Sequence, residues 1–573
     1  MKNLKKIVLL ILCHIVPPAL MIIGVEIMQK GSLDALMQWI AHYPNAFLLN
    51  YGIALVLLIF LWTIIGNLYI SFGVYFFTSF LLALLNVYKI KFLGEPIFPW
   101  DIFLSKQVFD LFPHIYKETN ILFVLFLILF LSLMIILVKW LPSPRLDFTY
   151  RIVGGILSVV LLISLSFYNS TPLVSVFQKV GVRNVTWVQN DNYRDNGVFL
   201  SFFMNMQSAI IIPPPDYGKG KMKNILNDIT KKYSSQTSVN LPLSPIKKPN
   251  VIFVMSESFS DPTYLSNVFF SQDPLPNFHS LLRNGKASWM LTPQMGGGTA
   301  NVEFEVLTGF NMSSLPGGSI PYQQYVNHPI PSLPAYFANE GYRTLAIHPY
   351  KKEFWNREQV YKNIGFQNFI SLEQFHNPKR SGGYFVDDSE VTQSIIQETE
   401  NSDKPVFIFA VTIQNHGTYH LSDHKYPKFP VKISGNISDQ AKENLYIYSN
   451  GLLDGDKQIR DLMTYFRNSH EPTIVVFFGD HLPSLSVYKE TKFVSQDKVN
   501  NTNTTPLVIW TNYGKKPEKL YNTVSASFLG TYVFELAGMN PPLFFSFLQT
   551  FRDALPGYSP KIKINNEGKM VRE

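Results

Sequence analysis

The sequence has almost no cysteine: Cys13 is the single one among 573 residues. It lies in an apolar run near the start of the chain, so the rest of the chain can form no disulfide within itself. The same absence excludes a thiolate nucleophile and a thiolate metal site from the C-terminal part. This composition agrees with a catalytic part that is exported from the cytoplasm.

The sequence also lacks a concentrated basic patch, although its formal net charge is +8. Binding to nucleic acid would need such a patch, so we expect no nucleic-acid partner. The excess of Lys and Arg instead fits the flanks of a membrane anchor and a surface beside anionic lipid. We therefore expect the lipid bilayer to be a partner.

Apolar runs are abundant, because hydrophobic residues make up 47% of the chain and aromatic residues 14%. Five stretches come near the ~17–25 residues that a helix needs to cross a bilayer. They are Ile7 to Val25, Phe47 to Gly66, Leu68 to Tyr88, Ile121 to Val138 and Ile152 to Tyr168. Buried core helices are the alternative interpretation, but the last four stretches contain no charged residue. We expect a transmembrane domain of five helices over residues 1–168.

The basic residues near these stretches predict the orientation of the chain. Lysines precede the first stretch as in a signal peptide, but no clear A-x-A site follows, so we expect an uncleaved anchor. Basic residues also lie between the fourth and fifth stretches. Both places should be cytoplasmic, which puts everything after Tyr168 outside the cell membrane. The contrary signal is the lysine-bearing loop 89–120, whose core "FLGEPIFPWDIF" is apolar enough to lie in the membrane interface.

Residues 169–248 read as a connector, and residues 249–573 as a separate α/β domain. The segment "NGVFLSFFMNMQSAIII" of the connector predicts an amphipathic helix lying on the membrane or on the domain. From Asn250 onward, short apolar runs alternate with helical segments, as in a mostly parallel sheet covered by helices. The predicted strands are 250–255, 342–347, 405–411, 473–478 and 506–510.

Polar residues follow four of these predicted strands. The segments are "SES" at 256–258, "HPY" at 348–350, "TIQNHGTYH" at 412–420 and "GDH" at 479–481. In open α/β sheets the carboxyl ends of the strands form the ligand crevice. The four segments should therefore converge on one edge of the sheet.

Two carboxylates and an imidazole in these segments suit a divalent metal ion. Glu257, Asp480 and His481 form a mixed oxygen and nitrogen set for Mn²⁺, Mg²⁺ or Zn²⁺. The stretch "GGGTANVEFE" presents Thr299 after three glycines, so its hydroxyl can be a fourth ligand and, as an alkoxide, a nucleophile. Taken one at a time, these segments are more often helix caps, turns or loops. Their joint placement behind strands is what favours a site.

These segments, with "FWNR" at 354–357, resemble the lipoteichoic acid synthases and related membrane phosphoglycerol transferases. That family is in the sulfatase branch of the alkaline phosphatase superfamily, and the resemblance covers nearly the whole chain. It implies that Mn²⁺ is bound by Glu257, Thr299, Asp480 and His481, with Thr299 as the nucleophile. It also implies that the headgroup and phosphate pocket is lined by His348, Trp355, Arg357 and His416.

The chemistry of those side chains agrees with such roles. Arg357 offers a planar fork for phosphate oxygens, and Trp355 can pack against a glycerol unit. His416 can protonate a departing diacylglycerol oxygen and later take a proton from the acceptor. The ordinary alternatives are structural: a lone His or Trp is more often part of a core, and Arg357 can simply open a helix.

The resemblance implies an enzyme that transfers glycerophosphate from phosphatidylglycerol to a glycolipid, a growing glycerol-phosphate chain or a glycan. Sulfatases of the same superfamily need a Cys or Ser in a C/S-x-P-x-R context, whereas Thr299 is followed by "ANVEFE". Many lipoteichoic acid synthases have a lysine just before the threonine and a Ser-Asp pair after it. This sequence has Gly298 before Thr299 and "AN" after it, so it departs from that pattern. A phosphoethanolamine-type transferase, a phosphodiesterase and a non-catalytic membrane scaffold remain the alternatives.

Overall fold

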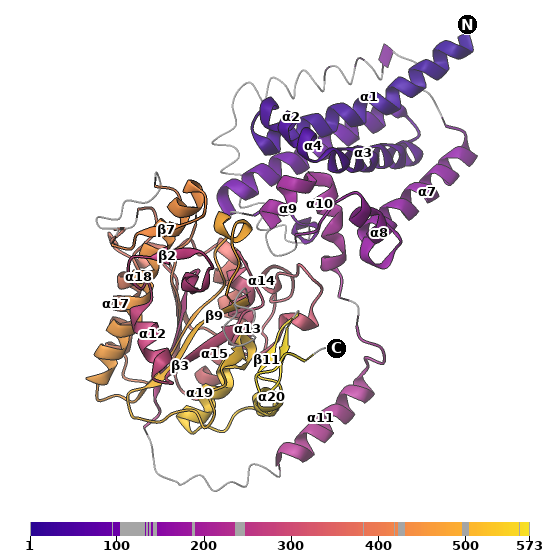
Figure 1. Ribbon diagram of the computed structural model, residues 1–573. Helices are drawn as coiled ribbons and strands as arrows, with labels where there is room; N and C mark the ends of the chain where they lie inside the picture. The colour runs from indigo at the N-terminus through magenta and orange to yellow at the C-terminus, as the bar shows by residue number, and fades with distance from the viewer. Residues whose placement is uncertain are drawn as a thin grey trace. The chain divides into compact units, whose positions relative to one another are not determined.

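The computed structural model divides the chain into two compact units (Figure 1). One comprises Met1–Ile211 with Pro316–Gly318, and the other Ile212–Leu315 with Ser319–Glu573. The structure describes all residues except 1, 94, most of 103–145, 186–188, 212, 235–246, 382, 418, 422–429, 495–502, 561 and 572–573.

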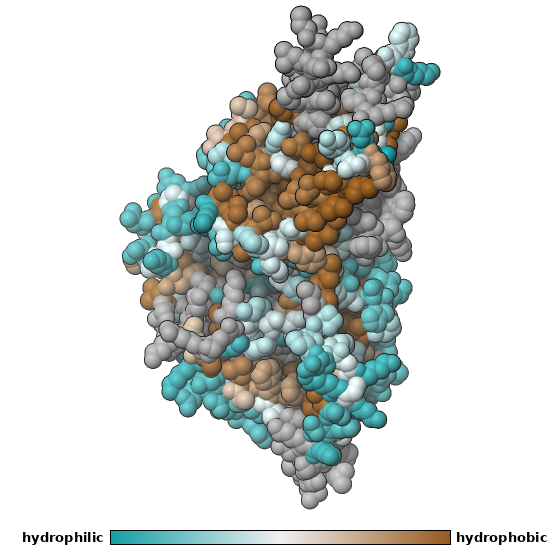
Figure 2. Space-filling view, turned by 90° about the vertical axis from the view of Figure 1, so that its right-hand side faces the viewer, coloured by the Kyte–Doolittle hydropathy of each residue, from teal (hydrophilic) through white to brown (hydrophobic). Residues whose placement is uncertain are grey.

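Long apolar helices make up the N-terminal unit. Its long elements are α1 (Lys2–Lys30), α2 (Leu33–His42), α3 (Pro44–Ile65), α4 (Leu68–Leu93) and α7 (Phe148–Ser166). Among the described residues, three segments are long and apolar enough to cross a membrane: Pro44–Ile65, Leu68–Lys91 and Phe148–Ser166. Apolar side chains gather on the surface of this unit in Figure 2. The chain is therefore membrane-associated.

The three segments overlap the second, third and fifth predicted spans. The first predicted span lies within the helix α1, in which residues 2–14 have no described side-chain exposure. The fourth, Ile121 to Val138, lies almost wholly outside the described residues. The number of five spans stays a prediction.

Short helices after α7 extend the N-terminal unit beyond the predicted end of the spans. They are α8 (Leu173–Lys179), α9 (Gln189–Asn196) and α10 (Val198–Met204). The segment that contains α10 was predicted to be an amphipathic helix lying on the membrane or on the domain. Six of the seven residues of α10 are instead buried, and four of these pack in the core of the helical unit. The backbone N–H of Leu200 donates to Asn50 of α3 at 3.0 Å, and that of Val198 donates to Glu26 of α1 at 2.8 Å.

An eight-stranded sheet forms the centre of the second unit. Its order is β10 (Thr523–Ser525), β3 (Ala287–Leu291), β9 (Thr504–Thr511), β8 (Thr473–Gly479), β1 (Asn250–Ser256), β6 (Val406–Val411), β4 (Arg343–Ile347) and β5 (Asn368–Ile370). The five predicted strands are confirmed. β9 runs antiparallel to both neighbours, and the other pairs are parallel. Two small sheets, β2 (Val268–Phe270) with β7 (Ile433–Gly435) and β11 (Gly557–Tyr558) with β12 (Lys563–Ile564), complete the unit.

Helices cover both faces of the large sheet, which is why β1, β6 and β8 read as continuous apolar runs. Alternate residues of β1 enter two separate cores: Phe253 packs in one and Val254 in the other. The first core takes side chains from α13 (Thr299–Thr308), α15 (Leu333–Asn339), α16 (Arg357–Asn363), α19 (Leu529–Ala537) and α20 (Leu543–Ala554). The second takes them from α12 (Pro276–Arg283), α17 (Asp388–Glu400) and α18 (Asp439–Arg467).

Candidate active site

The register of two neighbouring strands brings the predicted metal ligands together. β1 and β8 are parallel, and Ser256 of one is opposite Gly479 of the other. The next residues along the two strands, Glu257 and Asp480, therefore leave the same edge of the sheet side by side. Ligand atoms of Glu257, Asp480 and His481 all lie within 4.8 Å of one another, and all three residues are buried. We call these three residues the ligand cluster.

Gly479 allows the backbone to pack tightly beneath the ligand cluster. A Cβ atom at this position would lie 1.8 Å from the carbonyl oxygen of Phe259, which no side chain can tolerate. The close approach lets the backbone N–H of Ser258 donate to Asp480 Oδ1 at 2.7 Å. The N–H of His481 donates to the same oxygen, also at 2.7 Å. The carboxylate of Asp480 is thereby held in one orientation.

The other oxygen of Asp480 has no hydrogen-bond partner among the described residues, although it is buried. It lies 3.2 Å from Nε2 of His481. The Nδ1–H of His481 donates to the carbonyl of Leu482 at 3.0 Å, so in the neutral ring Nε2 carries a lone pair. Two electron pairs at this distance repel each other unless a cation lies between them.

Glu257 adds a second carboxylate to the same space. Its Oε1 lies 4.0 Å from Nε2 of His481. Burial, and then the negative charge of Asp480, raise the pKa of Glu257. Two buried carboxylates and an imidazole lone pair facing one point form a donor set that fits a divalent metal ion. The Nδ1–H bond to Leu482 is the kind of outer contact that orients a metal-binding histidine.

Thr299 begins helix α13 beside this cluster. Its Oγ1 lies 3.3 Å from Nε2 of His481, and the residue is 7% exposed. The preceding Gly298 has a φ of +86°, a left-handed conformation that favours glycine. The loop is tied to the ligand cluster because the N–H of Gly296 donates to the carbonyl of Leu482 at 2.8 Å. The hydroxyl of Thr299 thus faces the same point as the three ligands.

Arg357 is held by a partner that the sequence analysis missed, Glu303 of α13. Its Nη2 and Nε lie 2.5 Å and 3.1 Å from Glu303 Oε1, and both side chains are buried. The hydroxyls of Tyr361 and Tyr322 donate to the other carboxylate oxygen at 2.7 Å and 3.1 Å. We call these four residues the arginine cluster. The sequence contains one indication of this cluster: Glu303 follows Thr299 by one helical turn, so both side chains lie on the same face of the helix.

Arg357 nevertheless lies in the same region as the other predicted pocket residues. Its positive charge lowers the pKa of His348 and of His416, in both cases after the larger effect of burial. Among the described residues, the Nη1 group makes one long contact, 3.4 Å from the carbonyl of Phe354. Two of the three nitrogens of the guanidinium therefore bind Glu303 of α13, and Nη1 is the one that could donate to a ligand.

Both predicted pocket histidines are neutral and present Nε2. The Nδ1–H of His348 donates to the carbonyl of Val411 at 3.0 Å, and that of His416 to the carbonyl of Gly417 at 2.8 Å. Nε2 of His348 is buried with no partner among the described residues. A neutral Nε2 with a lone pair can accept a hydrogen bond from a substrate hydroxyl.

Trp355 is half-buried and has an unusual backbone conformation. Its φ of +58° and the φ of +57° at Asn356 are left-handed, which costs on the order of 1–3 kcal/mol at each position. The ring packs against the first core and lies 5.7 Å from the ring of Phe354. Asparagine tolerates this conformation but tryptophan does not, so the surrounding fold imposes it.

Comparisons with known proteins show which family and which proteins the chain resembles. The Sulfatase family model matches residues 249–539. The "Putative cyclic beta-1,2-glucan modification protein" of Rhizobium meliloti (strain 1021) is 33% identical over 511 residues, 86% of this chain and 77% of the relative. The lipoteichoic acid synthase of Staphylococcus aureus (strain USA300) is 25% identical over 244 residues, 41% of this chain and 36% of that protein.

A solved structure of a phosphoglycerol transferase is among those that resemble the chain. It is the Streptococcus pyogenes phosphoglycerol transferase GacH in complex with sn-glycerol-1-phosphate. The identity is 26% and the TM-score 0.52, over 59% of this chain and 87% of that one.

Proposed function

The chain belongs to the Sulfatase family, and from that premise we propose that it transfers glycerophosphate from phosphatidylglycerol to a glycan-type acceptor of the cell envelope. The observation that carries the proposal is the hydroxyl of Thr299, 3.3 Å from His481 Nε2 beside the ligand cluster. A threonine at this point disfavours sulfatase chemistry, which uses a matured Cys or Ser. A buried hydroxyl aimed at a cation site is instead suited to phosphoryl transfer.

The ligand cluster and Thr299 would hold the metal, for which Mn²⁺ is our proposal. When bound, the ion would neutralise charge on the phosphate oxygens and favour the ionised form of the Thr299 hydroxyl. The protein's own side chains would carry out the bond-forming and proton-transfer steps.

In the first step the oxygen of Thr299, having lost its proton to water, attacks the phosphorus of phosphatidylglycerol. The bond from phosphorus to the diacylglycerol oxygen breaks, and that oxygen leaves with a proton that His416 Nε2 takes up from water and passes on. Glycerophosphate then remains as an ester on Thr299. The lone pair of His348 Nε2 accepts a hydrogen bond from a glycerol hydroxyl, and Arg357 Nη1 contributes positive charge near the phosphate.

In the second step an acceptor hydroxyl attacks the phosphorus and gives its proton to His416. The bond to Thr299 breaks, and the threonine oxygen takes this proton from His416, which becomes neutral again. Burial lowers the pKa of His416, so its ring is neutral near pH 7 and ready to act as the base. Each side chain thus returns to its starting protonation state.

The relatives support both halves of this reaction. GacH is a phosphoglycerol transferase whose structure contains sn-glycerol-1-phosphate, which supports glycerophosphate as the transferred group. The name of the Rhizobium meliloti relative refers to glucan modification, which supports a glycan acceptor. The apolar helices of the N-terminal unit support a lipid donor.

The test uses the full chain in liposomes with phosphatidylglycerol labelled in its headgroup and Mn²⁺. Without acceptor, we expect a mass increment of one glycerophosphoryl group on the peptide that contains Thr299. With phosphatidylethanolamine as donor in a parallel sample, we expect no increment. An adduct on another residue, or an adduct from phosphatidylethanolamine alone, would contradict the proposal.

We also propose that the α/β unit lies outside the cell membrane, in agreement with the basic residues before the first apolar stretch. The stretch 212–248 between the helical unit and β1 should then be open to protease in intact cells. Cleavage that occurs only after lysis would reverse this orientation.

A further inference from the structure

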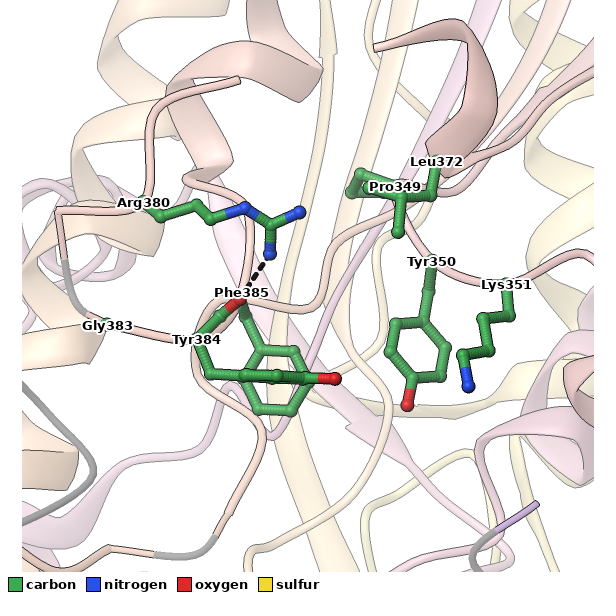
Figure 3. A pocket seen from close by; sticks show the side chains of 8 residues that line it. All are labelled: Pro349, Tyr350, Lys351, Leu372, Arg380, Gly383, Tyr384 and Phe385. Atoms are coloured by element: carbon green, nitrogen blue, oxygen red, sulfur yellow. Dashed lines mark hydrogen bonds between the residues drawn. The ribbon is translucent and has the colours of Figure 1, made fainter. Parts of the chain in front are cut away.

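A pocket lies beside His348 and His416, and the proposed donor step uses none of the residues that line it. Its volume is about 360 Å³, within the range of small-molecule sites, ~300–1,000 Å³. It is lined by Pro349, Tyr350, Lys351, Leu372, Arg380, Gly383, Tyr384 and Phe385. Figure 3 shows Tyr350 and Lys351 on one side and Arg380 and Tyr384 on the other.

Aromatic contacts join this pocket to the catalytic histidines. The rings of Phe385 and His416 have their centres 5.3 Å apart. The rings of Tyr350 and His348 are 6.1 Å apart, as are those of Tyr350 and Phe385. Phe385 therefore both lines the pocket and contacts His416, the group that takes the acceptor proton in the proposed reaction.

The walls of the pocket are held in place on both sides. The N–H and the hydroxyl of Ser381 donate to the carboxylate of Asp387 at 2.7 Å and 2.6 Å, next to Arg380. The guanidinium of Arg380 donates to the carbonyl of Tyr384. Across the pocket, the N–H of Leu372 donates to the carbonyl of Tyr350 at 3.0 Å. These bonds position the pocket before a ligand arrives, which reduces the entropy lost on binding.

The lining combines aromatic rings with positive charge. Three rings face the pocket, and Tyr384 is 65% exposed although it makes a wall. None of the described lining residues is acidic, and none of the ion pairs among the described residues includes Lys351 or Arg380. Flat rings with polar tips suit the C–H faces and hydroxyls of a sugar, and unpaired cations suit a phosphate.

We infer that this pocket binds the acceptor, and that the acceptor is a carbohydrate carrying a phosphate group near the hydroxyl to be modified. The inference rests on the proposed function. The sugar packs on Tyr384 and Tyr350, the phosphate pairs with Lys351 and Arg380, and the hydroxyl points to His416. The phosphate belongs either to the glycan itself or to a lipid that carries the sugar.

The experiment measures binding to the full chain in detergent by calorimetry, with no donor present. Three probes are compared: a neutral glucose oligosaccharide, the same oligosaccharide with one phosphate, and a glucose unit joined to a lipid phosphate. The wild type should bind one or both of the phosphate-bearing probes about tenfold more tightly than the neutral one. The probe that binds best identifies the source of the phosphate.

Variants of the pocket should change binding in two distinct ways. Tyr384→Ala should weaken all three probes about tenfold, because each contains a sugar. Lys351→Gln with Arg380→Gln should abolish the preference for phosphate and leave the neutral probe unchanged. Matched controls are Phe269→Ala, which removes a ring with the same 65% exposure outside the pocket, and Lys379→Gln, which removes a cation that faces Glu390 at 3.9 Å.

A wild type that binds none of the probes, or pocket variants that bind all of them unchanged, would overturn the inference. Release of diacylglycerol from phosphatidylglycerol vesicles is measured separately. The control Phe269→Ala should keep this release at the wild-type rate, and a loss of release in Tyr384→Ala alone would mean that the pocket holds the donor headgroup. No release by the wild type itself would overturn the proposed function and leave the binding result standing.

Discussion

Two groups of buried charges lie beside α13: the arginine cluster includes Glu303 of this helix, and the ligand cluster contacts Thr299, one turn earlier. Within the described part of the chain, only the first group has a partner for every charged oxygen. In the arginine cluster, each oxygen of Glu303 accepts hydrogen bonds, and Arg357 supplies the opposite charge. In the ligand cluster, Asp480 Oδ2 is buried without a partner among the described residues. A buried carboxylate oxygen with no donor costs free energy, so its retention indicates a ligand.

The two clusters therefore have different roles. The arginine cluster fixes α13 to α16 and so positions Thr299 at the end of its helix. The ligand cluster holds negative charge and a lone pair in a space that a cation would stabilise. Mutations should therefore affect the first group mainly through stability and the second mainly through metal binding and turnover.

The largest effect should come from the residue that joins the two groups. Thr299→Ala removes the nucleophile, and we expect headgroup transfer to fall on the order of 10³-fold or more. Stability should change little, because only a small part of the side chain is lost. Thr299→Ser should keep part of the activity, since the hydroxyl survives. Transfer from labelled phosphatidylglycerol measures the effect, and normal turnover by the alanine variant would exclude this nucleophile.

Removing the negative charge of the arginine cluster should cost stability. Glu303→Gln leaves the charge of Arg357 buried without its partner, and we expect a loss of about 3–5 kcal/mol in the free energy of unfolding. Adding Arg357→Met to this variant should recover part of the loss, because no buried charge then remains. Chemical denaturation of the full chain checks both. A single variant as stable as the wild type would show that the pair does not hold α13.

Removing a charge from the ligand cluster should not lower the free energy of unfolding in the absence of metal, in contrast to Glu303→Gln. Asp480→Asn keeps an acceptor for the N–H groups of Ser258 and His481 but relieves repulsion with Glu257. In the presence of a metal chelator, the variant should be at least as stable as the wild type.

Added metal should stabilise the wild type and Asp480→Asn to different extents. Mn²⁺ at a hundred times its dissociation constant should stabilise the wild type by about 2.7 kcal/mol and the variant by much less. Thermal unfolding with and without Mn²⁺ measures this, and equal stabilisation of both proteins would place the metal elsewhere.

A second glutamate on α13 offers a pH test. Burial raises the pKa of Glu305 to about 8 from a usual value of 4.5. The acid is therefore protonated in the folded protein and ionised in the unfolded one between these values. As pH rises from about 5 to 8, the wild type should lose stability relative to Glu305→Gln by up to ~1.4 kcal/mol per pH unit. Parallel pH profiles of unfolding for the two proteins would contradict this.

The smallest effect should come from an ion pair on the surface. Arg460 and Asp461 lie 2.9 Å apart with side chains 54% and 40% exposed. Arg460→Gln should change the free energy of unfolding by about 1 kcal/mol or less, because water screens the pair. A loss as large as that of Glu303→Gln would show that burial does not explain the contrast between the clusters.

The sequence by itself determined the five main strands and the edge of the sheet where Glu257, Asp480 and His481 leave it. Continuous apolar runs identify buried strands, and the residues after parallel strands meet at one edge, so both follow from local pattern. The same pattern predicted that the "GGGT" loop presents Thr299, and the structure places its hydroxyl beside His481.

Only the tertiary structure decided the direction of β9, the burial of α10 and the pairing of Arg357 with Glu303. An apolar run has the same appearance in a parallel and an antiparallel strand, and a short helix shows no sign of what covers it. Glu303 and Arg357 are 54 residues apart, so the bond between them exists only once α13 and α16 pack. The tautomer of each histidine has the same origin, because the carbonyl that accepts its Nδ1–H is placed by the folded backbone.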